Sequence, residues 1–358
     1  MIILGSTGSI GVNTLKIAKR YNLNVEVLVA GRNIELLNQQ IKQFNPTTVI
    51  ISSKSDIHKV NHNNVFAGQN AILDVIKSSK SKIVVNALVG FFGLAPTIEA
   101  IKQNKKVALA NKESLVVAGQ FLDISKIHPI DSEHFALWYL QDSSKTISSM
   151  TIMASGGSFR DIEIDKLKNV TVQEALNHPN WSMGNKITID SATMTNKIFE
   201  LIEAKWLFNT NKIDAIIEPK SIIHAMINFI DGSSTAHIAN TSMQLPIAYA
   251  LLGKVDKPIL EPINLLQIQS LEFRQIDPKR YPIWDIKQDM LNNPNLGVIL
   301  NSANDFAVEQ FLNGKIGFLD ITNITLNAIN KFHNIKITST DDIFQINKEV
   351  LLSIKDFI

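Results

Sequence analysis

Short apolar runs rich in β-branched residues alternate with helix-length segments through the first 130 residues of the chain. The pattern predicts buried strands at 1–4, 25–30, 48–52, 82–87 and 106–110, with a last strand running into 129–131. Between the strands it predicts helices at 12–20, 34–44, 71–80 and 95–104. Strands separated by helices indicate right-handed crossovers. We therefore expect an α/β fold that begins with a Rossmann-like parallel sheet.

From about residue 145 the pattern becomes that of a mixed α+β domain. A strand is expected at 148–154, and the capping-box spacing of 171–174 predicts the start of a helix. A long helical segment is expected at 190–208. Two strand-like runs, 221–230 and 234–239, flank Asp231-Gly232, and this dipeptide is typical of a tight hairpin turn.

The last third of the chain contains a proline-rich stretch and then helical periodicity. Prolines at 258, 262, 278 and 282 predict an extended linker. Beyond it, one helix face is formed by Ile321, Ile324, Ala328 and Phe332, and another by Ile343, Ile346, Val350 and Ile354 after a Ser339/Asp342 cap. The predicted division is a parallel-sheet domain at 1–133, an α+β domain at 134–255, a linker at 256–284 and a C-terminal helical bundle at 285–358.

Composition narrows the class of protein. Hydrophobic residues make up 45% of the 358 residues, which is enough for well-packed cores. Lys and Arg number 35 against 33 Asp and Glu, so no nucleic-acid partner is indicated. The absence of cysteine removes thiolate metal sites and a cysteine nucleophile. The most apolar stretch, 83–98, is short and interrupted by polar residues, glycine and proline. We expect no membrane partner and a cytoplasmic location.

A glycine-rich segment, Gly5–Gly11, follows the first predicted strand and opens the first helix. Glycines at such a place let the backbone approach a pyrophosphate, whose charge is stabilised by the N–H groups of the helix. The spacing is GxxGxxG, which is looser than the usual dinucleotide-binding pattern. The alternative is a glycine-rich turn without a ligand.

The end of the second predicted strand bears on the choice of cofactor. An acidic residue there would bind the ribose 2′-hydroxyl of NAD, but the chain has Gly31-Arg32-Asn33. An arginine can pair with a 2′-phosphate, so NADPH is favoured. The alternative is that Arg32 is only a solvated loop residue.

Polar residues further along the chain could bind a cation and an anion. Asp131 and Glu133 stand at i and i+2, so in an extended segment both carboxylates point the same way and suit Mg²⁺ or Mn²⁺. The loop 155–158 suits an anion, and Asn196 and Glu200 lie one helical turn apart. Ordinary surface polarity is the alternative for each of these features.

Several motifs occur together in one order: Gly5–Gly11, Ala110-Asn111-Lys112-Glu113-Ser114, Asp131-Ser132-Glu133-His134, Ala154-Ser155-Gly156-Gly157, His178-Pro179-Asn180-Trp181-Ser182-Met183-Gly184, Asp190–Lys197 and Ser221-Ile222-Ile223-His224. This order resembles the 1-deoxy-D-xylulose 5-phosphate reductoisomerase family, which makes 2-C-methyl-D-erythritol 4-phosphate for isoprenoid biosynthesis with NADPH. The resemblance covers nearly the whole chain and is most specific from His178 to Lys197.

The resemblance, and not the spacing, implies a role for each matching residue. NADPH would contact Thr7, Gly8, Ser9, Ile10, Gly31, Arg32, Asn33, Asn111, Glu113 and Gly184. Mg²⁺ or Mn²⁺ would be bound by Asp131, Glu133 and Glu200, which with Lys112 form the implied catalytic set. The sugar phosphate substrate would contact Lys112, Ser132, Glu133, Ser155, His178, Trp181, Ser191, Asn196, Lys197 and Glu200.

The resemblance also implies a mobile flap with Trp181 and Met183, edged by His224, and a homodimer. Two departures stand out, because Ser158 replaces the usual proline and Lys220 is a basic residue near His224. Two other kinds of protein compete with this interpretation. A different two-domain NADP-dependent dehydrogenase explains the glycine loop but not the set of carboxylates. A nucleotide-sensing module would need no metal site.

Overall fold

The computed structural model describes residues 1–355, and these residues form two compact units. The first unit comprises 1–114, 122–132 and 242–260. The second comprises 115–121, 133–241 and the chain from 261 onward. The four-part division expected from the sequence stays a prediction.

The first unit is built on a seven-stranded parallel sheet in the order β4-β3-β2-β1-β5-β6-β7. Its strands are β1 (Ile2–Leu4), β2 (Val27–Ala30), β3 (Thr48–Ile51), β4 (Val65–Ala67), β5 (Ile83–Asn86), β6 (Lys106–Leu109) and β7 (Ile127–Pro129). The predicted parallel sheet is confirmed. The sequence analysis missed the edge strand β4, because its three residues lie in a polar stretch and none is fully buried.

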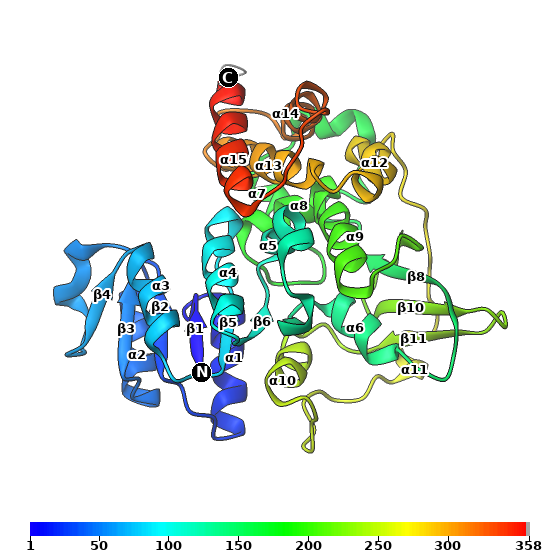
Figure 1. The fold of residues 1–358 in the computed structure, drawn as a ribbon. Coiled ribbons are helices and arrows are strands. Elements are labelled where there is room, and N and C mark those ends of the chain that lie inside the picture. The colour runs from blue at the N-terminus through cyan, green and yellow to red at the C-terminus, as the bar shows by residue number, and fades with distance from the viewer. Residues whose placement is uncertain (356–358) are drawn as a thin grey trace. The chain divides into compact units, whose positions relative to one another are not determined.

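Helices flank this sheet (Figure 1), and their buried residues are largely apolar. α5 (Lys112–Ala118) follows β6, but from Leu115 onward it belongs to the second unit. The helices of the first unit are α1 (Ser9–Arg20), α2 (Ile34–Phe44), α3 (Gln69–Ser78), α4 (Leu94–Lys102) and α10 (Gln244–Leu252). The last of these comes from much later in the chain. Its Ile247 and Ala248 are fully buried in the same core as Ile3 and Leu28. The core of the first unit is therefore closed by a returning segment.

The strand order reverses at β1, which pairs with β2 on one side and with β5 on the other. In open α/β sheets the crevice at the carboxyl end of such strands is where ligands bind. The glycine-rich segment after β1 lies at this point. A Cβ on Gly5 would lie 2.6 Å from the carbonyl oxygen of Ala87, just beyond β5, so only glycine fits there.

The second unit contains a mixed sheet in the order β11-β10-β8-β9. Its strands are β8 (Ile147–Ala154), β9 (Ile213–Ile217), β10 (Ile223–Phe229) and β11 (Ser234–Ile238). The predicted hairpin is confirmed, since β10 and β11 pair antiparallel and Gly232 in the turn has φ +85°. β8 pairs in parallel with β9 and antiparallel with β10, and β11 is an edge strand.

Two of the helices in this unit correct the sequence analysis. The helices here are α6 (Ser132–Leu140), α7 (Val172–Ala175), α8 (Asn185–Thr193) and α9 (Thr195–Phe208). The predicted single helix at 190–208 is wrong, because Met194 adopts a left-handed conformation with φ 70° and separates α8 from α9. Met194 is buried, and hydrophobic periodicity runs through it without a glycine or proline to signal the break.

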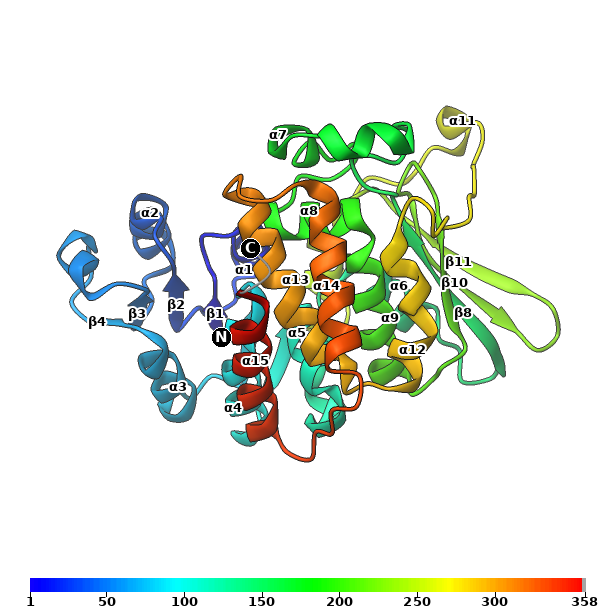
Figure 2. The ribbon, with the colours of Figure 1, turned by 90° about the horizontal axis from the view of Figure 1, so that it is seen from above.

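The C-terminal part of the second unit is helical, as predicted. It contains α12 (Lys287–Asn292), α13 (Leu296–Leu312), α14 (Phe318–Lys331) and α15 (Thr340–Ile354). One helical turn, α11 (Leu265–Ile268), lies within 256–284, the stretch expected to be an extended linker. Figure 2 shows α13 packed against both α14 and α15. The predicted buried face of α15 and its Ser339/Asp342 capping box are confirmed. Phe332 is an exception, since it only caps the end of α14 and is half-buried.

Short 3₁₀ turns complete the described chain, at η1 (Lys54–Lys59), η2 (Gly90–Gly93), η3 (Gly119–Phe121), η4 (Ile124–Lys126), η5 (Ile164–Asn169) and η6 (Pro282–Ile286). Among residues 1–355, none of the helices has the length and apolarity that crossing a bilayer requires.

Candidate active site

The glycine-rich segment forms the turn from β1 into α1. Gly8 precedes the first residue of α1 in extended conformation, and the first turn of that helix carries no acidic side chain. A Cβ on Gly11 would lie 2.3 Å from the carbonyl oxygen of Gly5, so the turn closes tightly on itself. Gly8 and Ser9 are exposed, and Thr7 and Ile10 are half-buried. The exposed backbone at a helix N-terminus suits a phosphate group.

The segment after β2 is exposed in all three of its residues, Gly31, Arg32 and Asn33. Asn33 caps α2, since its Oδ1 accepts a hydrogen bond of 3.1 Å from the backbone N–H of Leu36. A Cβ on Gly31 would meet no atom within 4 Å. The guanidinium of Arg32 is thus presented to solvent at the carboxyl end of the sheet, as a 2′-phosphate contact requires.

Asn111 and Glu113 have a clear structural role in the loop after β5. The Nδ2 of Asn111 donates to the carbonyl oxygens of Leu88 (3.0 Å) and Gly90 (2.9 Å) and to Oε2 of Glu113 (2.7 Å). Glu113 Oε1 accepts from the N–H of Gly90 at 3.2 Å. Both side chains are buried and brace this loop. Their predicted contact with the cofactor stays a prediction.

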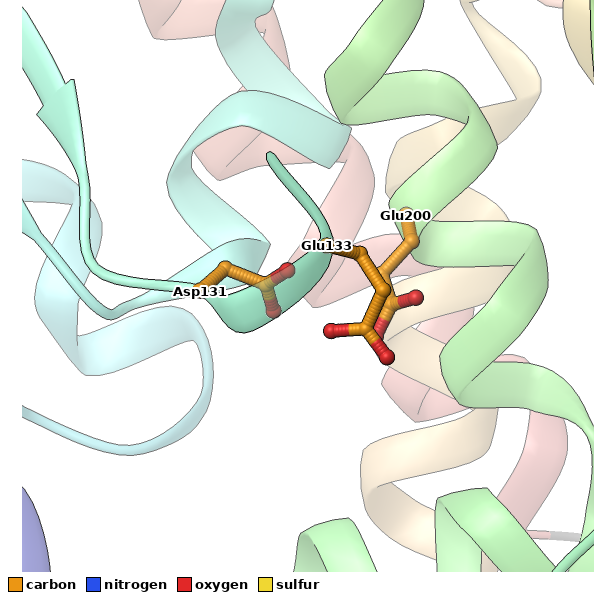
Figure 3. A group of neighbouring side chains, drawn as sticks. All are labelled: Asp131, Glu133 and Glu200. Carbon is orange, nitrogen blue, oxygen red and sulfur yellow. The ribbon is translucent and has the colours of Figure 1, made fainter. Parts of the chain in front are cut away.

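Three carboxylates converge as the resemblance implied. Asp131, Glu133 and Glu200 each offer one oxygen, and these oxygens all lie within 4.8 Å of one another (Figure 3). The premise of an extended segment at 131–133 is wrong, because Ser132 begins α6 and Glu133 lies in its first turn. Glu200 comes from α9 and is almost fully buried, at 1% exposure. Sequence spacing had no means of placing it there.

Two lysines offset part of the charge of these three acids. Lys112 forms an ion pair with Asp131. Lys197 Nζ lies 3.1 Å from Glu133 Oε1 and pairs also with Glu200. Buried carboxylates need compensating cations, and a set made only of oxygen donors is the one that Mg²⁺ and Mn²⁺ prefer. The donor set therefore fits the implied divalent ion.

His134 takes part in this arrangement and was not assigned a role from the sequence. Its Nε2 lies 2.9 Å from the carbonyl oxygen of Glu200, and its Nδ1 lies 3.9 Å from Glu203 Oε2. The imidazole is fully buried. It thus joins α6, which carries Glu133, to α9, which carries Glu200. Its position next to Glu133 in the sequence was the one available signal.

A second group of polar side chains forms around Ser155. The backbone N–H groups of Asn180 and Trp181 donate to Nδ1 of His178, at 3.2 and 3.0 Å. Nδ1 therefore carries no proton, and Nε2–H donates to Ser155 Oγ at 2.8 Å. Burial and the neighbouring Arg160 lower the pKa of His178 to about 4. The imidazole is neutral at pH 7.

The hydroxyl of Ser155 is poised to donate a hydrogen bond. Its oxygen accepts from His178 and from the N–H of Gly157 at 3.1 Å, so its own hydrogen must point elsewhere. Ser191 Oγ lies 3.4 Å away. Two serine hydroxyls beside the glycine loop 155–158, with Gly156 and Gly157 both at positive φ, make a suitable cradle for an anion.

Neighbouring residues fix the loops of this cradle. Arg160 Nη1 donates to the carbonyl oxygens of Ser155 (2.8 Å) and Pro219 (3.2 Å). Asn180, which the sequence analysis quoted but gave no role, donates to the Pro219 carbonyl oxygen and to Ser221 Oγ, both at 2.7 Å. These contacts tie the segment before Gly184 to the turn that leads into β10.

Both departures from the family pattern have ordinary partners. Ser158 Oγ donates to the carbonyl oxygen of Ala175 at 2.7 Å, so a hydrogen bond holds the loop where proline is usual. Lys220 Nζ donates to the carbonyl oxygens of Ile268 (2.7 Å) and Ser270 (2.8 Å). Neither residue adds to the charge presented by the cradle.

The predicted flap is a segment without regular structure between α7 and α8. Trp181 and Met183 are half-buried, and the Trp181 ring lies edge-on to His224 at 6.1 Å between centroids. Gly184 is exposed and stands immediately before α8. Trp181 and His224 are thus brought together, and the motion of the flap stays a prediction.

Asn196 and Lys197 lie near the carboxylates. Asn196 Nδ2 donates to Glu200 Oε1 at 2.5 Å, and its Oδ1 is buried without a hydrogen-bond partner. Lys197 Nζ donates to the carbonyl oxygen of Met153 at 2.6 Å besides its ion pairs. An orphaned buried oxygen is rare, and it fits a place where a ligand hydroxyl supplies the missing donor, which an ionised phosphate group does not have. The phosphate contacts expected of both residues stay predictions.

Comparison with known proteins matches this chain along most of its length. A family model described as 1-deoxy-D-xylulose 5-phosphate reductoisomerase matches residues 1–119. Models of the C-terminal domains of the same family match residues 127–208 and 238–351. The 1-deoxy-D-xylulose 5-phosphate reductoisomerase of Nautilia profundicola is 55% identical over 357 residues, which cover 98% of both chains. That of Wolinella succinogenes is 49% identical over 353 residues, again covering 98% of both.

A solved structure agrees with these matches. A DOX-P reductoisomerase in complex with NADPH, fosmidomycin and magnesium superimposes with a TM-score of 0.93. The two chains are 31% identical, and the match covers 99% of this chain and 97% of the other. Together with the converging carboxylates and the order of the motifs, the identities over nearly full length show that the chain belongs to the 1-deoxy-D-xylulose 5-phosphate reductoisomerase family.

Proposed function

We propose that this chain converts 1-deoxy-D-xylulose 5-phosphate into 2-C-methyl-D-erythritol 4-phosphate with NADPH and a divalent metal ion, and that the residues described above carry out the reaction. The activity is that of the family to which the chain belongs. The observation that carries the residue-level proposal is the convergence of Asp131, Glu133 and Glu200 beside Lys112.

The first requirement of the reaction is a fixed cation. Asp131, Glu133 and Glu200 would hold Mg²⁺ or Mn²⁺, which when bound acts as a Lewis acid toward the substrate oxygens. His134 holds the backbone of Glu200, and Asn196 holds its carboxylate, so the orientation of this ligand is set within the chain.

Lys112 and Ser132 contact the reacting end of the substrate in this proposal. Lys112 is buried and paired with Asp131, which holds its ammonium group in one place. There it donates hydrogen bonds to the oxygen on which negative charge develops while the carbon skeleton rearranges. NADPH supplies the hydride that reduces the resulting aldehyde.

Ser155, Ser191, Asn196 and Lys197, with His178, bind the phosphate in this proposal. His178 acts on Ser155 by donating from Nε2–H, which directs the serine hydrogen outward. Binding energy from the phosphate, far from the reacting carbons, drives closure of the segment that carries Trp181 and Met183. The indole then excludes water from the aldehyde.

NADPH would bind at the carboxyl end of the parallel sheet, where the segments after β1 and β2 are exposed. The N-terminus of α1 binds the diphosphate through Thr7, Gly8, Ser9 and Ile10, and Gly31, Arg32 and Asn33 surround the adenosine phosphate. Asn111 and Glu113 brace the loop at 88–90, so their contact with NADPH would come in addition to that role. Gly184 completes the proposed set.

We also propose that the chain acts in the cytoplasm as a homodimer that pairs through the four-stranded sheet. The edge strand β11 is consistent with this, because Ile238 in it is 42% exposed and Ile230 in the hairpin turn region is 76% exposed. Light scattering should give about twice the 39.8 kDa of one chain, and a mass equal to one chain would contradict the dimer.

Turnover should depend on the metal and on Glu200. We expect NADPH oxidation with 1-deoxy-D-xylulose 5-phosphate in the presence of Mg²⁺ or Mn²⁺ and its loss after chelation. Glu200→Gln keeps the shape of the side chain but removes its charge, so turnover should fall on the order of 10²–10³-fold. NADPH binding, followed by cofactor fluorescence, should persist.

Glu309→Gln, which changes an exposed carboxylate of α13, is the control for this experiment. It should behave as the unmodified chain. Full activity of Glu200→Gln, or full turnover in the absence of any divalent ion, would show that the assigned ligands are wrong.

The choice between NADPH and NADH should depend on Arg32. Arg32→Asp replaces a cation with an anion that repels a 2′-phosphate, so the preference, measured as the ratio of kcat/KM for the two cofactors, should shift toward NADH. Lys42→Asp makes the same change of charge on the exposed face of α2 and should leave the ratio unchanged. An unchanged ratio in Arg32→Asp would refute the proposed contact.

Stability should decline in acid partly because of His178. Its pKa is about 4 in the folded chain, below the ordinary value of 6.5, so the unfolded chain binds the extra proton first as pH falls. The contribution is complete above about pH 6.5 and is lost as pH falls toward 4. Glutamine binds no proton in this pH range, so the variant lacks this loss of stability. The thermal midpoint of His178→Gln should therefore fall less between about pH 7.5 and 4.5 than that of the unmodified chain.

His333→Gln removes an exposed histidine and serves as the control. Its midpoints should run parallel to those of the unmodified chain. Parallel curves for His178→Gln as well would contradict the description of His178 as a neutral hydrogen-bonding group.

A further inference from the structure

A largely buried polar cluster joins α8 to α13, and the proposed chemistry uses none of its members. Lys186 Nζ lies 2.7 Å from Asp190 Oδ2 and 3.1 Å from Asp305 Oδ1. Asn304 Nδ2 donates to Asp190 Oδ1 at 2.7 Å. We call these four residues the α8–α13 cluster. Lys186 and Asp190 lie one turn apart on α8, and the other two lie side by side on α13.

The cluster is placed where charge is expensive to bury. Asn304 is fully buried, and the side chains of Asp190, Lys186 and Asp305 are 3%, 15% and 23% exposed. Charged side chains are retained in such places only when they are paired and hydrogen-bonded, and their directional bonds then specify one arrangement of the elements that carry them. Here the elements are α8 and α13.

The opposite side of α8 meets the phosphate cradle. A Cβ on Gly157 would lie 2.5 Å from Ala192 Cα and 2.7 Å from the carbonyl oxygen of Ser191. The glycine loop therefore packs directly on the backbone of α8, next to Ser191, whose Oγ is 3.4 Å from Ser155 Oγ. Asp190 directly precedes Ser191 in the chain. Any rotation of α8 would move Ser191 relative to Ser155.

Lys186 extends the cluster toward the carboxylates. Its Nζ lies over the ring of Phe199 at 5.0 Å from the centroid, and Phe199 is the residue before Glu200 on α9. Because the chain breaks at Met194, α8 and α9 are separate helices, and contacts between their side chains are needed to fix their relative orientation. The cluster thus touches the supports of both the serine hydroxyls and Glu200.

We propose that Asn304 and Asp305 are positioning residues. They hold α8 in the one orientation in which Ser191 and Ser155 can both donate hydrogen bonds to the same phosphate group. The inference rests on the proposed function, because it concerns the phosphate of that substrate. The C-terminal helices would then affect substrate binding as well as stability. They would fix the geometry of the phosphate site without providing a side chain that contacts the phosphate.

The alternative is that the cluster only stabilises the bundle, and α13 offers a matched control. Ser302 lies two positions before Asn304 and is 1% exposed. Its Oγ bonds to the carbonyl oxygen of Val298 (2.7 Å) and to Asn347 Oδ1 of α15 (2.6 Å), and so it faces away from α8. Ser302→Ala removes a buried hydrogen bond from the same helix without reaching Asp190.

The test compares Asn304→Ala with Ser302→Ala in the full chain with NADPH and Mg²⁺. We expect the KM for 1-deoxy-D-xylulose 5-phosphate to rise about 10- to 100-fold in Asn304→Ala, with a smaller change in kcat. The inhibition constant of inorganic phosphate should rise in parallel. Ser302→Ala should lower the thermal midpoint but leave both constants unchanged.

A reciprocal exchange keeps the inference testable if Asn304→Ala does not fold. Asn304→Asp alone sets two carboxylates against each other, and adding Asp190→Asn restores one donor and one acceptor across the same gap. The double variant should reverse most of the increase in KM that Asn304→Asp alone causes. Failure of the double variant to recover it would overturn the inference.

Further outcomes separate this inference from the function on which it rests. An unmodified chain that does not turn over 1-deoxy-D-xylulose 5-phosphate would refute the proposed function. An active unmodified chain in which Asn304→Ala loses stability at unchanged KM would refute the positioning role alone. So would equal increases of KM in Asn304→Ala and Ser302→Ala.

Discussion

Three carboxylates lie close together in this structure, and the need to offset their negative charge is the constraint on which the rest of it depends. Asp131, Glu133 and Glu200 bring their oxygens within 4.8 Å of one another, two of them on residues that are buried. Like charges at such distances repel strongly wherever water is excluded. Lys112 and Lys197 supply two positive charges beside them, which equals the charge of the divalent ion that the site suits. The same crowding that destabilises the fold therefore creates the affinity for a cation.

The surrounding elements can be understood as supports for that arrangement. Glu133 lies in the first turn of α6 and Glu200 in the middle of α9, and His134 connects the two helices by bonding to the backbone of Glu200. Lys197 connects Glu133, Glu200 and the end of β8 through the Met153 carbonyl oxygen. Sheet, helices and site are thus joined by polar contacts, with Asn196 Oδ1 left as a buried oxygen without a hydrogen-bond partner, and the apolar cores supply most of the stability.

Local patterns predicted much of the fold, because strands and helices in parallel sheets leave strong signals. The five buried strands and four helices of the first 110 residues were all found, with ends displaced by a few residues. The failures share a cause. β4 has no buried run to reveal it, and Met194 breaks a helix through a backbone conformation that no glycine announces. Both are set by tertiary packing, which a window of neighbouring residues does not contain.

The site was predicted less by physics than by the order of its motifs. Spacing alone proposed Asp131 and Glu133, for the wrong reason, and could not reach Glu200, which is 67 positions beyond Glu133. The hydrogen bonds that direct Ser155, and the role of Asn111 in bracing the loop at 88–90, depend on residues far apart in the chain.

The left-handed residue between α8 and α9 also has an electrostatic effect. In a single helix from 185 to 208, Asn196 and Lys197 would lie in mid-helix, where a bonded carbonyl oxygen offsets the partial positive charge of each N–H group. The break at Met194 instead starts a new helix of 14 residues, whose N-terminal peptide dipoles place partial positive charge at 195–197. Two of the N–H groups there have partners, since Thr195 donates to Thr193 Oγ1 (3.4 Å) and Lys197 to the Met194 carbonyl oxygen (3.0 Å), and the N–H of Asn196 lies between them. One strained backbone angle thus moves positive potential into the middle of the site without adding a charged side chain.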